Sequence, residues 1–372
     1  MTDIYYSYSL FAAWVLLFFF GIYLFWGKVP DKGFDLYLRS RKILGVALFL
    51  FAVQVFVQWL FDFRGKNPQI ASALNLTCFY LQAILFGMSF ISLLDKRYIN
   101  RRQIVSDFTK WILFVIYLWV SVLAVPSPLS HILLLLASAF FFIDATRITL
   151  IFFRTYRIAV KKVQNYYSEN VDCFVHWLYK STYGIIFFGL ICSVMAFAPK
   201  WAVTIYMSLG IFMFIYIFVC FLNYMINFEQ IEIAVEESED EQANESEPTS
   251  DMALDDTAKP LLYQQIEERL KIWKEEEGFR KNGITVNQLA IKLKTNRTYL
   301  STYINKEYGC TFREWIGSMR IEMAKQILQD RSEKTIEEVA EEVGFASSSH
   351  FVRFFSQREN LSPAKWREKF HH

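Results

Sequence analysis

Long apolar runs fill the first 228 residues of this 372-residue chain, and amphipathic patterns follow them. A transmembrane helix needs about 20 consecutive, mostly apolar residues. Seven runs come close to that length, near 7–26, 43–61, 71–94, 108–125, 129–152, 180–198 and 201–226. From residue 261 onwards, apolar positions recur at a spacing of three or four, which is typical of soluble helices with one buried face. The pattern predicts an all-α protein with a seven-span transmembrane helical bundle over 1–228 and a helical domain over 261–372.

The loops between these expected spans differ in their content of basic residues. Alternate loops carry Lys28, Lys32, Arg39, Arg41 and Lys42, then Lys96, Arg97, Arg101 and Arg102, then Arg154, Arg157, Lys161 and Lys162. The loops on the other side carry only Arg64, Lys66 and Lys200. Cytoplasmic loops of membrane proteins are enriched in Lys and Arg. We therefore predict that the N-terminus lies outside and that the C-terminal domain is cytoplasmic.

Two ionisable residues, Asp144 and Arg147, fall inside the fifth expected span. An ionisable group within a membrane is by default a candidate functional site, here an intramembrane switch. Their spacing of three also suits an ion pair on one helix face, with the arginine reaching towards the interface. Both interpretations stay open. The outside loops are short, so a stimulus would be a small lipophilic ligand, a property of the bilayer or a membrane partner.

Residues 229–260 contain 12 acidic residues and one basic residue, with few large apolar side chains. Such a segment buries too little surface to offset the entropy of ordering, so we expect a disordered acidic linker. It serves as a flexible tether, or it competes electrostatically with DNA for the basic face of the domain that follows. The charge pattern does not decide between the two.

The domain over 261–372 contains two copies of one pattern. In the first copy Thr285 precedes a short helix, and Asn296 begins a second helix with Leu300 and Ile304 inward. The pattern returns about fifty residues later, with Thr335, Ala340, Gly344, Phe351 and Phe355 in the corresponding places. A capped short helix, a tight turn and a second capped helix make a helix-turn-helix unit. The run FREWIGSMRIEMAKQILQ predicts one long helix that connects the two copies.

These residues resemble the DNA-binding domain of AraC/XylS-type transcription regulators. The resemblance rests on Arg320-Ile321-Glu322-Met323-Ala324, Ile336, Ala340, Gly344-Phe345, Phe351, Arg353, Phe355, Leu361-Ser362-Pro363 and Trp366-Arg367. It covers about 110 residues and does not extend to the apolar part. The whole layout resembles the membrane-bound AraC-type regulators of Bacteroidetes-like bacteria, which implies the bacterial inner (cytoplasmic) membrane as the location.

In that family the second helix of each copy enters the major groove of double-stranded DNA. Carried over by position, the expected contacts are Arg297, Thr298, Ser301, Thr302 and Lys306 in the first copy, and Ser348, Ser349, Val352, Arg353 and Gln357 in the second. An arginine can read a guanine through two hydrogen bonds. The sequence departs from the family pattern at Lys294 and Asn360, where glycine is common, so a left-handed turn at Lys294 would carry an energetic cost.

Together the patterns favour a membrane-embedded one-component transcription regulator, with the lipid bilayer and DNA as partners and pairing into a homodimer compatible with paired DNA sites. Five scattered cysteines without metal-ligand spacing predict no metal, no cofactor and no disulfide framework. No phosphate-binding loop or catalytic triad is found, so we expect no enzyme. The alternatives are a transporter or receptor with a regulatory DNA-binding tail, and a membrane-anchored factor released by proteolysis.

Overall fold

The structure is a computed structural model that describes residues 2–28, 35–62, 67–126, 128–168, 175–195, 198–246, 258–330 and 333–370. The chain separates into two compact units. The first unit comprises residues 1–159 and 174–229, and the second comprises residues 160–173 and 230–372. Within the described ranges the regular structure is helical, with a single isolated β-bridge between Tyr167 and Thr285. The all-α prediction is therefore confirmed for these ranges.

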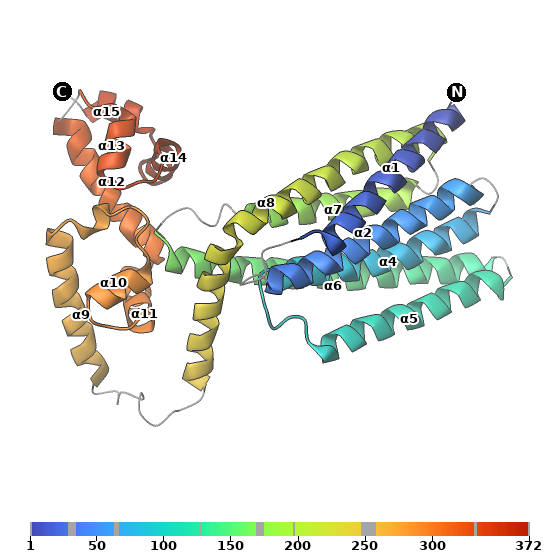
Figure 1. The fold of residues 1–372 in the computed structure, drawn as a ribbon, viewed down its shortest axis with the longest axis horizontal. Coiled ribbons are helices and arrows are strands. Elements are labelled where there is room, and N and C mark those ends of the chain that lie inside the picture. The colour runs from blue at the N-terminus through green and yellow to red at the C-terminus, as the bar shows by residue number, and fades with distance from the viewer. Residues whose placement is uncertain are drawn as a thin grey trace. The chain divides into compact units, whose positions relative to one another are not determined.

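Long helices build the first unit (Figure 1). They are α1 (Thr2–Trp26), α2 (Asp35–Phe61), α4 (Pro68–Ser92), α5 (Arg101–Leu123), α6 (Leu129–Tyr166), α7 (His176–Met195) and α8 (Lys200–Ser246). Figure 1 shows these helices running alongside one another as a bundle. The last part of α6 and of α8 passes out of this unit and into the second.

Six of the described helices are long and apolar enough to cross a membrane. They cover Asp3–Trp26, Asp35–Phe61, Gln69–Ser92, Arg101–Leu123, Leu129–Tyr166 and Lys200–Met225. The sixth expected span, near 180–198, is not among these six; it coincides with α7, whose side chains are described only as far as Ile191. Residues 196 and 197, near the end of that expected span, lie outside the described residues.

Close contact between α1 and α2 depends on two facing glycines. A Cβ on Gly21 would lie 2.8 Å from the backbone nitrogen of Phe49, and one on Gly45 would lie 3.0 Å from the carbonyl oxygen of Gly21. Small residues of this kind let helix backbones approach each other. Buried Arg41 of α2 donates to the carbonyl oxygens of Gly27 and Tyr23, both at 2.9 Å. A cation is favourable there because the C-terminus of a helix carries partial negative charge.

Helix α8 differs from the sequence prediction at its C-terminal end. It continues to Ser246, so the first part of the expected disordered linker is helical. The segment 229–246 has no glycine or proline and is rich in Glu, Gln and Ala, which are good helix formers. Extending an existing helix also avoids the unfavourable nucleation step. The remainder of the expected linker, 247–257, lies outside the described residues.

Short helices build the second unit. They are α9 (Ala258–Glu275), η2 (Gly278–Arg280), α10 (Val286–Lys292), α11 (Arg297–Tyr308), α12 (Phe312–Asp330), α13 (Ile336–Glu342), α14 (Ser348–Glu359) and α15 (Pro363–Phe370). Helix α12 is the predicted connecting helix. It packs on both halves of the unit, one formed by α9 to α11 and the other by α13 to α15. Trp315 of α12 stacks on Trp273 of α9 with ring centroids 5.7 Å apart, and Ile321 joins a core that includes Phe351 and Trp366.

The Arg320 side chain in α12 is fully buried and fixes the backbone at η2, between α9 and α10. Its Nε donates to the carbonyl oxygen of Phe279 at 2.9 Å, and its Nη2 donates to that of Lys281 at 2.8 Å. The guanidinium also lies over the ring of Phe345, 5.5 Å from its centroid. A buried charge is tolerated when it is fully hydrogen-bonded in this way. Because α12 is one continuous helix fixed to both halves, it sets their spacing.

Candidate nucleic-acid interface

The first helix-turn-helix unit consists of α10 and α11, and side-chain caps define both helix starts. The Thr285 hydroxyl accepts from the backbone N–H of Gln288 at 3.2 Å, and the Asn296 side chain accepts from that of Tyr299 at 2.8 Å. Both residues have extended backbone, as caps of this type require. Between the helices, the N–H of Thr295 donates to the carbonyl oxygen of Ala290 at 3.0 Å.

The second helix-turn-helix unit, α13 and α14, repeats this construction. Thr335 and Glu338 form a capping box, and Ser347 accepts from the backbone N–H of His350 at 3.3 Å. In the turn, the N–H of Phe345 donates to the carbonyl oxygen of Ala340 at 2.9 Å. This bond corresponds to the Thr295–Ala290 bond of the first copy. The two copies predicted from the sequence are therefore present, with a side-chain cap at each helix start and the same turn bond.

The two turns reach a left-handed backbone by different means. Gly344 has φ +92°, and a Cβ there would lie 2.1 Å from the carbonyl oxygen of Arg280. Lys294 holds φ 52° without being glycine. Its turn is supported by Arg269, whose Nη1 donates to the carbonyl oxygens of Leu293 at 2.6 Å and of Lys294 at 3.2 Å. These bonds satisfy carbonyl groups that the end of α10 leaves unpaired.

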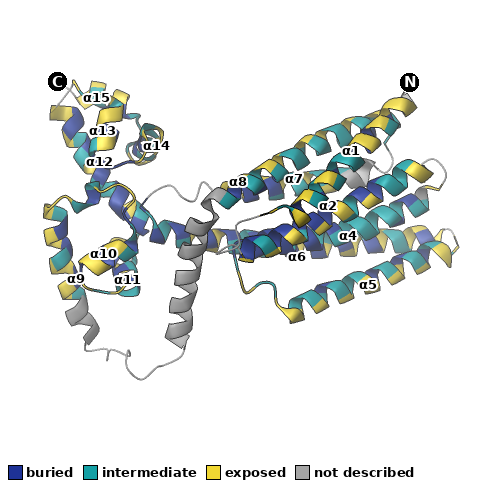
Figure 2. Cartoon of the chain, viewed as in Figure 1, coloured by how far each residue is buried: buried dark blue, intermediate teal, exposed yellow. Residues whose placement is uncertain are grey.

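The ten residues predicted to contact DNA all lie on α11 and α14, and they differ in exposure. Five side chains are exposed, namely Thr302 and Lys306 on α11 and Ser349, Arg353 and Gln357 on α14. Four are half-buried, namely Thr298, Ser301, Ser348 and Val352. Val352 also packs against the core of the second copy. Three of the five predicted contacts on α14 are thus exposed, compared with two of the five on α11. Figure 2 shows the burial of the residues along the helices of this unit.

Arg297, the first residue of α11, is buried, with an exposed fraction of 9%. Its guanidinium lies over the ring of Tyr166, 5.2 Å from the centroid. Tyr166 belongs to the segment 160–173, which is part of the second unit. The same segment adds a backbone hydrogen bond from Ser168 to the carbonyl oxygen of Ile284, at 3.2 Å. In this arrangement Arg297 stacks on an aromatic ring, and its predicted contact with DNA stays a prediction.

Two titratable groups near these helices have shifted pKa values. The backbone N–H of Thr335 donates to the Glu338 carboxylate at 2.7 Å, and this bond, with that from the Thr335 hydroxyl, lowers the pKa of Glu338. Burial raises the pKa of Tyr303 on α11 to about 12. Tyr303 therefore stays neutral at physiological pH, and Glu338 stays ionised there. The cap that begins α13 is consequently charged under cellular conditions.

In the first unit, the predicted pair of Asp144 and Arg147 is an ion pair, with Arg147 Nε 2.6 Å from Asp144 Oδ1. Arg147 Nη2 also lies 3.0 Å from Asp107 Oδ1 on α5, and the Tyr80 hydroxyl of α4 donates to Asp144 at 2.9 Å. The network thus joins α4, α5 and α6. Its geometry suits the structural interpretation, and the role as a switch stays a prediction.

Sequence analysis did not identify three residues that shape these sites. Arg269 supports the turn at Lys294, Tyr166 covers Arg297, and Asp107 completes the charge network. Arg269 and Tyr166 act across 24 residues and more in the sequence. Of these three residues, only Asp107 stands out in the sequence, because it is an acidic residue at the start of an apolar run. The other two contacts depend on tertiary packing alone.

Comparison with known proteins identifies a helix-turn-helix domain family over residues 289–369. PqrA of Proteus vulgaris, described as a probable transcription factor, is 31% identical over 96 residues, 26% of this chain and 78% of PqrA. The HTH-type transcriptional regulator YtdP of Bacillus subtilis is 31% identical over 86 residues, 23% of this chain. The chain spans only 11% of the length of YtdP.

Among solved structures, the C-terminal domain of AraT, a response regulator from Geobacillus stearothermophilus, is 28% identical to this chain. The match covers 29% of this chain and 87% of that domain, with a TM-score of 0.26. The family match over residues 289–369 runs from α10 to α15, and each of the three proteins aligns with less than a third of the chain.

Proposed function

Since the chain belongs to the AraC-type helix-turn-helix transcription regulators, through a domain confined to its C-terminal part, we propose that it is a membrane-embedded regulator that binds specific DNA. Helices α11 and α14 are the recognition helices. The transmembrane bundle formed by the first unit controls them. The observation that carries the proposal is the pairing, in one chain, of two capped helix-turn-helix units with six helices of membrane-spanning length and composition.

The chemistry of α14 supports base recognition. Arg353 and Gln357 are exposed one turn apart, so they lie on the same face of the helix. Arginine can bind guanine through two hydrogen bonds, and glutamine can do the same with adenine. The exposed Lys306 on α11 suits a phosphate oxygen, which fixes the register of the protein on the duplex.

Exposed apolar side chains on the first unit support a bilayer around it. Phe19, Leu135, Ile143 and Phe212 are between 64% and 71% exposed. Soluble proteins rarely expose contiguous apolar patches larger than a few hundred Å². Such side chains are instead well solvated by lipid. Most of the large apolar side chains that are exposed among the described residues belong to this unit, and few belong to the second.

The direct test of DNA binding is nuclease footprinting with full-length protein in lipid nanodiscs on promoter fragments. Two recognition helices on one face of DNA should protect two segments about one helical turn apart. Protection that is uniform along every fragment would contradict site-specific binding. Lys271→Ala is a matched control for Arg353→Ala on α14. It also removes one exposed positive charge, but from α9, outside the two recognition helices.

Reporter fusions test the proposed topology. A reporter active only outside the cytoplasm should work when fused after Lys66 or Lys200 and stay silent at the C-terminus. Activity at the C-terminus would contradict the proposed orientation. Control by the bundle is tested separately, by replacing residues 1–228 with one unrelated span. If regulation is unchanged by this replacement, the bundle is only an anchor.

A further inference from the structure

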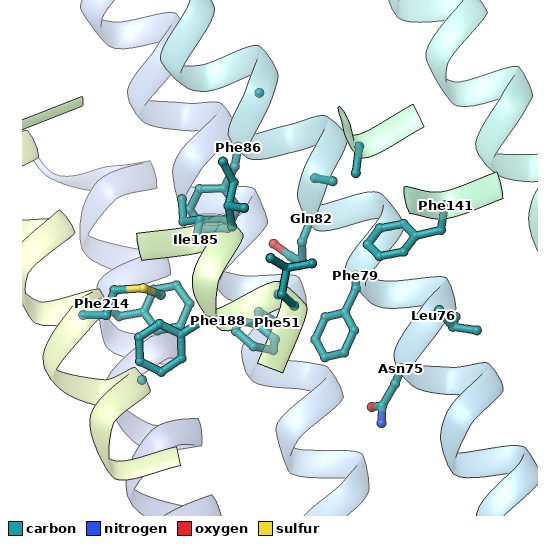
Figure 3. Close-up of a pocket in the computed structure, with 18 of the residues that line it drawn as sticks. Phe51, Asn75, Leu76, Phe79, Gln82, Phe86, Phe141, Ile185, Phe188 and Phe214 are labelled. Atoms are coloured by element: carbon teal, nitrogen blue, oxygen red, sulfur yellow. The ribbon is translucent and has the colours of Figure 1, made fainter. Parts of the chain in front are cut away.

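The first unit contains a cavity of about 370 Å³ between α1, α2, α4, α6, α7 and α8 (Figure 3). This volume lies within the range of small-molecule sites, which is roughly 300–1,000 Å³. Phenylalanine rings make up much of the wall, including those of Phe51, Phe79, Phe86, Phe141 and Phe188. Side chains from six helices line the cavity, so it is a feature of the bundle as a whole.

One wall residue, Gln82 of α4, directs an unpaired polar atom into this apolar space. Its side chain is 93% buried, with an exposed fraction of 7%. The carboxamide nitrogen donates to the carbonyl oxygen of Ala47 at 3.0 Å. Only the nitrogen can donate to a carbonyl group, so that bond fixes the orientation of the amide. The oxygen Oε1 is consequently the group left over, and it is buried without a hydrogen-bond partner.

Figure 3 shows the Gln82 oxygen pointing among the apolar side chains of the wall. On α7, the hydroxyl oxygen of Thr182 lines the same cavity and is also buried without a partner. Leaving a buried acceptor unsatisfied is energetically unfavourable. The carboxamide oxygen of Asn75, by contrast, already accepts from Gln54 at 2.9 Å. Among the described residues that line the cavity, Gln82 and Thr182 are therefore the two with a buried side-chain oxygen that a ligand could satisfy, and the Gln82 oxygen can only accept.

The wall also limits the charge of a ligand. Among the described residues that line the cavity, none is Lys, Arg, Asp or Glu. An ion would lose its hydration there without gaining a partner, which is strongly unfavourable. A pure hydrocarbon would fill the space but leave Gln82 Oε1 unpaired. The ligand that matches both features is uncharged, mostly apolar and equipped with a hydroxyl donor.

We propose that this cavity binds an uncharged lipophilic alcohol, whose hydroxyl donates to Gln82 Oε1 and accepts from the hydroxyl of Thr182. The hydrocarbon part lies against the phenylalanine rings. Two of the wall helices, α6 and α8, continue along the chain into the second unit. A ligand that binds two arrangements of these helices with different affinity shifts the balance between them. This regulatory consequence rests on the proposed function, whereas binding itself does not.

The test measures binding of radiolabelled dodecanol to purified full-length protein in nanodiscs, with dodecane and dodecanoate as competitors. Dodecanol should bind saturably, and both competitors should displace it poorly. Gln82→Leu should weaken binding about tenfold, because the hydroxyl loses its acceptor. Thr182→Val should weaken it less. Gly210→Leu should abolish it, since Gly210 lines the cavity and an added Cβ would meet only Phe188, at 3.8 Å.

Unchanged affinity in Gln82→Leu, or displacement by dodecane as effective as that by dodecanol, would overturn the proposal. If Gln82→Leu does not fold, which circular dichroism and gel filtration detect, Thr182→Val and Gly210→Leu decide the outcome. Footprinting of the same preparations is a separate readout. If the wild-type protein gives the footprint but does not bind dodecanol, this site alone is contradicted. If the wild-type protein binds dodecanol but gives no footprint, the proposed function alone is contradicted.

Discussion

The two helix-turn-helix units follow one plan, and two of the equivalent positions at which they differ bear on DNA binding. In the turn, the first copy has Lys294 at φ 52° where the second has Gly344 at φ 92°. On the recognition helix, the first copy exposes Thr302 where the second exposes Arg353. The second copy thus has the less strained turn and the side chain better suited to reading a base. From this difference we infer that the second copy contributes more to specificity.

The largest effect should follow from placing a side chain at Gly344. In Gly344→Ala the added Cβ would lie 2.1 Å from the carbonyl oxygen of Arg280, so the turn between α13 and α14 must distort. Positive φ adds further strain for any residue other than glycine. We expect a loss of about 3 kcal/mol or more in the free energy of unfolding, together with loss of DNA binding. Thermal unfolding measures the first, and an unchanged melting temperature would show that the turn can adapt.

Substitutions on the two recognition helices measure how much each helix-turn-helix copy contributes to specific DNA binding. Arg353→Ala should weaken specific DNA binding by about 1–3 kcal/mol, the value of a bidentate contact with guanine. Thr302→Ala at the equivalent position should weaken it less. Fluorescence anisotropy on the footprinted site, at fixed salt concentration, gives both affinities. Equal losses of DNA affinity in the two variants would show that the two copies contribute equally, contrary to this inference.

The Tyr166 ring provides a way to strengthen the first copy. In Tyr166→Ala the stacking partner of Arg297 is gone, and the guanidinium gains access to solvent and DNA. We expect affinity for DNA to rise several-fold, because an additional cation can reach the phosphates. Tyr167→Ala is the control, since the bridge from that residue to Thr285 is formed by the backbone. If the two variants have the same affinity as the wild type, the contact does not restrict Arg297.

A smaller effect is expected where the first turn is strained. Lys294→Gly should stabilise the domain by about 1 kcal/mol, because glycine adopts positive φ without steric penalty. Asn360, at φ 56° after α14, should gain less from the same change, since asparagine tolerates this conformation. Chemical denaturation of both variants measures these differences. A destabilised Lys294→Gly would show that the lysine side chain supports the turn.

The smallest effect concerns pH. Hydrogen bonds from Thr335 lower the pKa of Glu338 in the folded state. The resulting stabilisation is present above the ordinary glutamate pKa and is lost as pH falls through the lower folded value. Glu338→Gln should therefore flatten the loss of stability on acidification in the α13 region, which amide hydrogen exchange resolves. An identical pH profile in the variant would exclude this contribution.

The sequence predicted the local features of the second unit well. Caps such as Thr285 and Thr335 and the turn glycine Gly344 act within a few residues, so their signals lie side by side in the chain. The contacts of Arg269 with Lys294, and of Tyr166 with Arg297, join residues that are distant in sequence. Periodicity carries no information about such pairs. The cavity beside Gln82 was not predicted for the same reason, because six helices must pack before it exists.

The helical extension of α8 shows another limit of sequence reasoning. A high negative charge predicted disorder for 229–260, but local helix propensity and the preceding apolar helix favour a continuous helix as far as Ser246. A high net charge indicates that a segment cannot build a hydrophobic core of its own. It does not determine whether that segment extends an existing helix.

Genome-wide DNA occupancy of the full-length protein, compared with Arg353→Ala at equal abundance in the membrane, measures site-specific recognition in the cell. We expect a small number of sharp promoter peaks for the wild-type protein that disappear in the variant, while membrane insertion and helical content stay the same. Peaks that persist unchanged in Arg353→Ala, or the absence of sharp peaks in both, would contradict site-specific recognition through α14.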